Sequence, residues 1–148
     1  MTHHLAQFNV GRLLAPIDHP DTAEFVAGLD PINALADGAP GFVWRLQTES
    51  GNATEVQVSD DPYLIVNLSV WESVDALRDY VFGADHAAYL RRRREWFSRL
   101  GEAHLVLWWI DAGHVPTVEE SLERLERLRT EGPSPDAFTL ARPFDAPA

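Results

Sequence analysis

Apolar and polar side chains alternate at the start of the chain, where Ala6, Phe8 and Val10 fall on one face and polar residues on the other. This period of two predicts a β-strand over residues 4–11 with one apolar face. Three further apolar runs predict strands, and two of them are apolar on both faces, as in strands that are covered on both sides. These runs occupy residues 42–46, 63–71 and 102–111.

Apolar residues spaced by three and four positions predict helices between these strands. In the first helix, Phe25, Leu29 and Ile32 form one apolar stripe. Pro31 lies within this helix, and we expect a kink or a restart there because proline removes a backbone hydrogen bond.

A second helix is predicted between the N-cap residue Ser73 and Gly83, and a third helix covers about residues 86–99. Helical spacing brings one set of side chains in the third helix onto a single face. This set consists of His86, Leu90, Arg93 and Phe97.

The last helix, at about 118–130, begins with a capping box formed by Thr117 and Glu120. The segment after Gly132 holds several prolines, and residues 137–140 are expected to add a short edge strand. The predicted order is β-α-β-β-α-α-β-α. Because its core is the split-βαβ plan, the predicted fold class is α+β, a ferredoxin-like antiparallel sheet with helices on one face.

The length fits one domain over residues 1–148, with a core over about 4–131 and a proline-rich tail over 132–148. Helices on one face alone would leave tryptophan-rich surface in water, which soluble monomers seldom do. Two such sheets packed face to face would bury that surface. We therefore expect a homodimer that forms an α+β barrel.

Composition narrows the class of partner. The net charge of −11 argues against a nucleic-acid partner, because phosphate binding requires an excess of Lys and Arg. The chain has no Cys, so disulfides and thiolate sites are excluded. No apolar run approaches the roughly 20 residues that span a bilayer, so no membrane partner and a cytoplasmic location are expected.

Four runs carry a resemblance to a known family: INALADGAPGFVWRL, SVWESVDAL, HAAYLRRRREWF and WWIDAGHVPTVEE. They resemble an uncharacterised bacterial family of the dimeric α+β-barrel superfamily, which also holds the antibiotic-biosynthesis monooxygenases. The resemblance extends over about residues 4–140. It implies a ferredoxin-like subunit, a dimer built through the sheets, and a pocket between sheet and helices. It implies no single reaction, because relatives include cofactor-free oxygenases, haem enzymes, isomerases, cyclases and proteins without known catalysis.

Three residues are the candidates for catalysis. His86 follows Asp85 at a helix start and suits a general acid or base, or a ligand of metal or haem; a bond to a neighbouring carboxylate is the structural alternative. Arg93, on the same helix face, can hold a carboxylate or enolate, or simply form an ion pair. Asn33 is a polar residue on an apolar helix, which marks either a structural hydrogen bond or a wet pocket.

Five further residues are candidates for contact with a substrate, although aromatic residues at such spacing are more often core. They are Tyr89, Trp96, Trp71, Asn67 and Trp44. His86, His104 and His114 have no spacing that predicts a shared metal site, so neither a metal nor another cofactor is expected.

Together these features favour a small-molecule enzyme that acts on a hydrophobic, carbonyl-bearing or aromatic metabolite. The reaction would be a cofactor-independent oxygenation, isomerisation or cyclisation, in which His86 moves the proton while Arg93 and Asn33 hold the oxyanion. The alternatives are a non-catalytic dimer that binds a ligand or partner, and a haem protein that uses His86.

Overall fold

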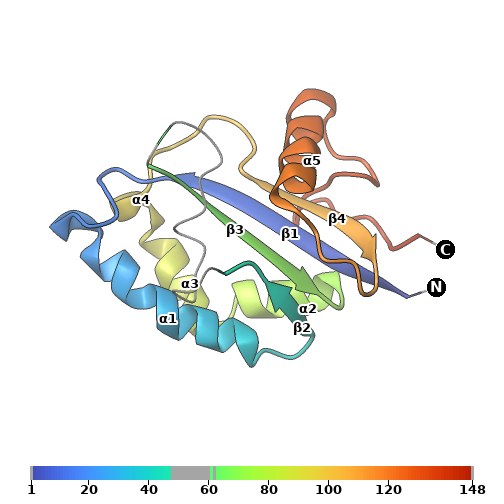
Figure 1. Cartoon of the computed structure of the whole chain (residues 1–148), viewed down its shortest axis with the longest axis horizontal. Helices are drawn as coiled ribbons and strands as arrows, with labels where there is room; N and C mark the ends of the chain where they lie inside the picture. The colour runs from blue at the N-terminus through green and yellow to red at the C-terminus, as the bar shows by residue number, and fades with distance from the viewer. Residues whose placement is uncertain (1, 48–60, 62, 148) are drawn as a thin grey trace.

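Four strands form an antiparallel sheet in the order β2-β3-β1-β4 in the computed structural model, which describes residues 2–47, 61 and 63–147 (Figure 1). The strands are β1 (His3–Arg12), β2 (Phe42–Arg45), β3 (Leu64–Trp71) and β4 (Leu105–Asp111). With the first and third strands central and all pairs antiparallel, the sheet has the ferredoxin-like plan, so the predicted fold class is confirmed.

The expectation that helices cover one face alone is wrong, because helices lie on both faces of this sheet (Figure 1). The helices on the first face are α1 (Ala23–Asp37), α2 (Val74–Val81), α3 (Ala84–Arg91) and α4 (Arg93–Trp96), preceded by the 3-10 turn η1 (Pro20–Thr22). The remaining helix, α5 (Val118–Glu131), lies across the opposite face. Within the described ranges, no helix is both long enough and apolar enough to cross a membrane.

The alternation in β1 divides its side chains between the two faces as predicted. Ala6, Phe8 and Val10 join the core cluster that also holds Leu125 and Leu128 of α5. The polar residues between them face α1–α4 instead. One side of the sheet is thus an apolar core, and the other carries the polar groups of the strand.

The restart expected at Pro31 is wrong, because α1 runs without a break from Ala23 to Asp37. Pro31 lacks the N–H that would bond the Ala27 carbonyl. Both residues are exposed, so water can replace the lost hydrogen bond.

The predicted helix over 86–99 is divided in two by a turn at Arg92. The Arg92 side chain forms ion pairs with Glu24 of α1 and with Glu95. These contacts tie the turn to α1, so the break is a feature of the tertiary structure that helical periodicity does not reveal.

The last helix covers the face that the sequence analysis assigned to a second copy. The Thr117 side chain accepts a bond from Glu120 N at 3.0 Å, which confirms the predicted cap. Trp108 of β4 packs in the same cluster as Leu125 and Leu128 and is 0% exposed within one chain. The homodimer remains a prediction, but an uncovered Trp108 is no longer a reason for it.

The core extends beyond residue 131, where the sequence analysis ended it. Phe138 is 0% exposed, and its N–H and C=O each bond Leu107 of β4 at 2.8 Å. Farther along, the carbonyl of Phe144 accepts a bond from Trp109 Nε1 at 2.8 Å. The proline-rich segment therefore closes the β4 edge, and the expected edge strand is present as a single β-bridge.

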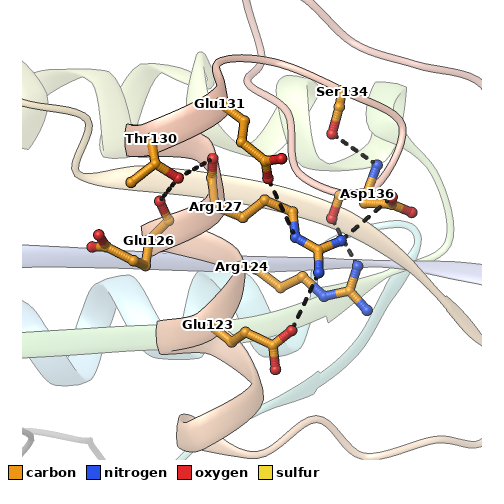
Figure 2. A network of polar contacts seen from close by, with 8 residues as sticks. All are labelled: Glu123, Arg124, Glu126, Arg127, Thr130, Glu131, Ser134 and Asp136. Atoms are coloured by element: carbon orange, nitrogen blue, oxygen red, sulfur yellow. Dashed lines mark hydrogen bonds and ion pairs between the residues drawn. The ribbon is translucent and has the colours of Figure 1, made fainter.

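Polar contacts hold the start of this segment against α5 (Figure 2). Arg127 lies between three carboxylates, those of Glu123 at 3.4 Å, Glu131 at 3.8 Å and Asp136 at 3.4 Å. Arg124 Nη1 donates to the Asp136 carbonyl at 2.8 Å. Exposed ion pairs each contribute little, so the hydrogen bond to the backbone is the more specific contact.

Candidate functional site

A cavity of about 280 Å³ lies between the sheet and α1–α4. Its floor is the polar side of the two central strands, where Gln7 pairs with Ser69 and Asn9 with Asn67. Apolar and aromatic residues of the helices form the other walls. This combination of apolar walls and a few convergent polar groups is typical of small-molecule sites.

One hydrogen-bonded network joins the floor residues. Gln7 Nε2 donates to Asn67 Oδ1 at 2.9 Å and to Ser69 Oγ at 2.8 Å. Asn9 Nδ2 donates to Gln7 Oε1 at 2.5 Å. Asn67 uses its oxygen in this network, and its amide N–H groups have no acceptor within the described ranges, so they can donate to a ligand. Gln7 and Asn9 are not among the site residues predicted from the sequence, although both are polar residues on a largely buried strand.

Aromatic rings form one end of the cavity. Trp71 stacks on Tyr80 with ring centroids 5.0 Å apart, and Tyr80 contacts His86 at 4.9 Å. The Tyr80 hydroxyl donates to the Ile32 carbonyl at 3.1 Å, which links α2 to α1. Burial raises the pKa of Tyr80 to about 12, so its hydroxyl stays protonated at neutral pH. Tyr80 had no signal in the sequence beyond its place on α2.

His86 has one ring nitrogen bonded and one open. Its Nδ1 lies 3.1 Å from the Val81 carbonyl, which can only accept, so Nδ1 carries the hydrogen. Nε2 has no hydrogen-bond partner among the described residues. Burial lowers the pKa of His86, and the bond to Val81 opposes this only in part. His86 is therefore a neutral imidazole with a free acceptor nitrogen.

A second pocket, of about 250 Å³, lies outside this end of the cavity between α1 and α2. His86 and Tyr80 line both spaces. His86 can therefore be approached from the cavity and from the outer pocket.

Arg93 marks the opposite end of the cavity. Its guanidinium carbon lies 5.1 Å from the centroid of the Phe97 ring, and that ring packs on the backbone of Gly11. Gly11 pairs with Ile65 and Leu5 pairs with Trp71, so the two ends lie over strand positions six residues apart. His86 and Arg93 themselves are seven residues apart along α3 and α4, a rise of roughly 10 Å at about 1.5 Å per residue. Arg93 and His86 line the same cavity, but toward different ends.

The other candidates are distributed as follows. Asn33, Trp71, Asn67 and Trp96 line the cavity, together with His86 and Arg93. Asn33 adjoins Ile32 on α1, which sets it toward the His86 end. Trp44 lies outside the cavity and packs against the core cluster on the α5 face, because its strand position points the other way. The side chain of Tyr89 lies outside the described residues.

The described part of the chain holds no group of three or more His, Cys, Asp or Glu side chains close enough to bind a metal ion.

Two half-buried histidines predict a pH dependence of stability. Burial is the main cause that lowers the pKa of both His86 and His104. Below about pH 6.5 the unfolded chain therefore takes up protons that the folded chain does not, so the free energy of unfolding should fall as the pH drops from 7 to 5. Urea titrations at these pH values measure the slope, which should flatten in a His86→Gln, His104→Gln double variant.

An unchanged slope in that double variant would contradict this assignment. The carboxylates whose pKa is lowered, such as Glu120, should add their own loss only below about pH 4.5. The two pH ranges therefore separate the histidines from the acids.

The architecture, a ferredoxin-like α+β fold, is shared with solved structures at low sequence identity. One is Rv0793 from Mycobacterium tuberculosis, with 15% identity, a TM-score of 0.51, and coverage of 77% of this chain and 99% of that chain. Another is SnoaB from Streptomyces nogalater, a cofactor-independent oxygenase, with 17% identity and a TM-score of 0.51. The match covers 77% of this chain and 97% of that chain. At such identities the likeness shows a common fold alone.

The family described as "Domain of unknown function (DUF3291)" matches residues 4–148, and the chain belongs to it. This confirms the predicted membership in an uncharacterised family that has the fold of the monooxygenase-like proteins. No curated protein matches the chain.

Proposed function

We propose that the chain is a small-molecule enzyme in which His86 removes a proton from a hydrophobic carbonyl-bearing or aromatic compound, without a bound cofactor. The observation that carries this proposal is the free Nε2 of a neutral imidazole at the wall of a ligand-sized cavity. A general base must be unprotonated near neutral pH and within reach of its substrate.

The step follows from the groups around His86. A C–H bond next to the carbonyl breaks, its proton moves to Nε2, and the electron pair passes to the oxygen as an enolate. The Val81 carbonyl, already bonded to Nδ1, stabilises the imidazolium that forms. The amides of Asn33 and Asn67 have N–H groups with no partner among the described residues and can hold the enolate oxygen.

The enolate, which carries negative charge on carbon as well as on oxygen, can react in three ways. Attack on dioxygen gives oxygenation, attack on a second carbon of the same molecule gives cyclisation, and protonation at another carbon gives isomerisation. SnoaB, with the same fold, is a cofactor-independent oxygenase, so the first outcome has the support of analogy. A cavity of about 280 Å³ suits a ligand of one or two rings better than a porphyrin, so the haem alternative has less support.

Exchange of hydrogen for deuterium tests the proposal before the natural substrate is known. Aromatic 1,3-dicarbonyl compounds and naphthols are incubated with the protein in D₂O, and loss of the acidic C–H signal is followed by NMR. A compound that exchanges with the wild-type protein should exchange about 100-fold or more slowly with His86→Gln. Affinity, measured by tryptophan fluorescence, should change only a few-fold.

His114→Gln is the matched control, because His114 lies on the other side of the sheet and pairs with Glu120. It should keep the wild-type exchange rate. Equal rates in wild type and His86→Gln would rule out His86 as the base. Binding without exchange of any compound would favour a binding protein, and a haem absorption band lost in His86→Ala would favour the haem alternative.

A further inference from the structure

Arg93 differs from the other partly buried arginines of the described chain. Each of those donates to a carboxylate or a backbone carbonyl of the protein. They are Arg12, Arg45, Arg78, Arg92, Arg124, Arg127 and Arg129. Arg93 has no such acceptor among the described residues, although the chain has a net charge of −11.

The position of Arg93 is fixed by aromatic packing. Its guanidinium carbon lies 5.1 Å from the Phe97 ring centroid, and Phe25 meets that ring edge-on at 5.0 Å. A side chain at Gly11 would leave no room for the ring, because an added Cβ would lie 2.6 Å from Phe97 Cε1. The guanidinium therefore packs against aromatic rings, while its hydrogen-bond donors have no acceptor among the residues that the structure describes.

His104 lies at the same end of the cavity. Its backbone carbonyl accepts from Val10 N at 2.9 Å, which fixes the residue at the start of β4. Its imidazole has no hydrogen-bond partner among the described residues and lines the cavity with Arg93. Burial and the positive charges of Arg93 and Arg129 lower the pKa of His104, so it is neutral at pH 7 and can still donate one N–H.

The nearby Arg129 is already engaged. Its Nε donates to the Ala103 carbonyl at 2.7 Å, and Nη1 lies 3.4 Å from Glu102. The positive charge available for a ligand at this end is thus that of Arg93. A partly buried cation without an anion is unfavourable, and a bound anion would offset that cost.

We propose that Arg93 and His104 form a subsite for a carboxylate, at the far end of the cavity from His86. The planar guanidinium can bind both carboxylate oxygens, and the imidazole N–H can donate to one of them. The ligand class is an elongated aromatic acid, whose ring lies along the Asn9–Asn67 floor. The orientation of the reacting carbon toward His86 rests on the proposed function, whereas binding of the acid does not.

Matched ligands test the subsite on the wild-type protein. 2-Naphthoic acid and 2-naphthamide have nearly the same shape and differ in charge. Calorimetric titration at pH 7 should show the acid binding about 10- to 100-fold more tightly. Equal affinity for the two compounds would overturn the proposal.

Variants then assign the effect to Arg93. Arg93→Gln should lose the preference for the acid and leave the affinity for the amide unchanged within a few-fold. Arg94→Gln removes the same charge from the next residue, which is exposed, and should keep the preference. Arg93→Lys keeps the positive charge but cannot bind both carboxylate oxygens in the planar geometry of a guanidinium, so it should retain part of the preference for the acid. This variant tests the subsite where the Gln variant folds poorly. Equal losses in Arg93→Gln and Arg94→Gln would point to net charge and overturn the subsite.

The two proposals fail separately. Preference for the acid without deuterium exchange of any compound would support the carboxylate subsite and contradict the proposed enzymatic function. Deuterium exchange that depends on His86, without a preference for acids, would support the proposed enzymatic function and contradict the carboxylate subsite.

Discussion

Replacing Trp71 by Ala is expected to lower the free energy of unfolding by about 3–5 kcal/mol, the range for removing a buried Trp or Phe from a core. Trp71 is 1% exposed, stacks on Tyr80 and meets Phe42 edge-on at 5.4 Å. Its Nε1 also donates to Ser69 Oγ at 2.9 Å. Urea unfolding followed by circular dichroism measures the loss.

The same change should also open the aromatic end of the cavity. His86 is positioned through Tyr80, so loss of the Trp71 ring loosens both rings, and His86-dependent exchange should fall with stability. Trp71→Phe is the matched control, because it keeps a ring but not the bond to Ser69. Its free energy of unfolding should fall by about 1–2 kcal/mol. A loss below about 1 kcal/mol in Trp71→Ala would mean that the ring is not part of a packed core.

Trp108→Ala should also cost about 3–5 kcal/mol, and the loss should not depend on protein concentration. Trp108 is 0% exposed within one chain, under Leu125 and Leu128. Its Nε1 donates to Glu120 at 3.0 Å, and the same carboxylate binds His114 at 2.8 Å. Because α5 provides these contacts, the cost belongs to the fold of the single chain.

Thermal unfolding at protein concentrations 100-fold apart measures this directly. A midpoint that rises with concentration in the wild type, together with a loss in Trp108→Ala that grows with dilution, would show that a partner covers this face instead. Trp108→Phe keeps most of the apolar contact and lacks the N–H, so its smaller loss reports the bond to Glu120.

The strands and their faces are properties of the sequence. Alternation in β1 separates Phe8 from Gln7, and this separation survives folding because successive side chains on a strand point to opposite faces. In the same way, His86, Leu90, Arg93 and Phe97 all reach one cavity, although the helix that carries them is broken at Arg92. Local periodicity determines which side of an element faces the sheet. The break at Arg92 does not change that side for these four residues.

The arrangement of the site residues in space could not be predicted from local periodicity. Tyr80 and His104 join the cavity only because α2 and the start of β4 are brought over the polar floor. Trp44 and Trp71 are both tryptophans on strands, yet one faces α5 and the other faces the cavity. Residue type carries no information on that choice.

The sequence by itself determined the α+β class, the four strands, the cap at Thr117 and the family, because these depend on short-range periodicity, capping and residue runs. The tertiary structure alone decided that α5 covers the second face, that Phe138 completes the core, and that His86 and Arg93 lie toward opposite ends of one cavity. These features depend on contacts between residues far apart in the chain. Such contacts are set by how the elements pack together, which a one-dimensional pattern does not contain.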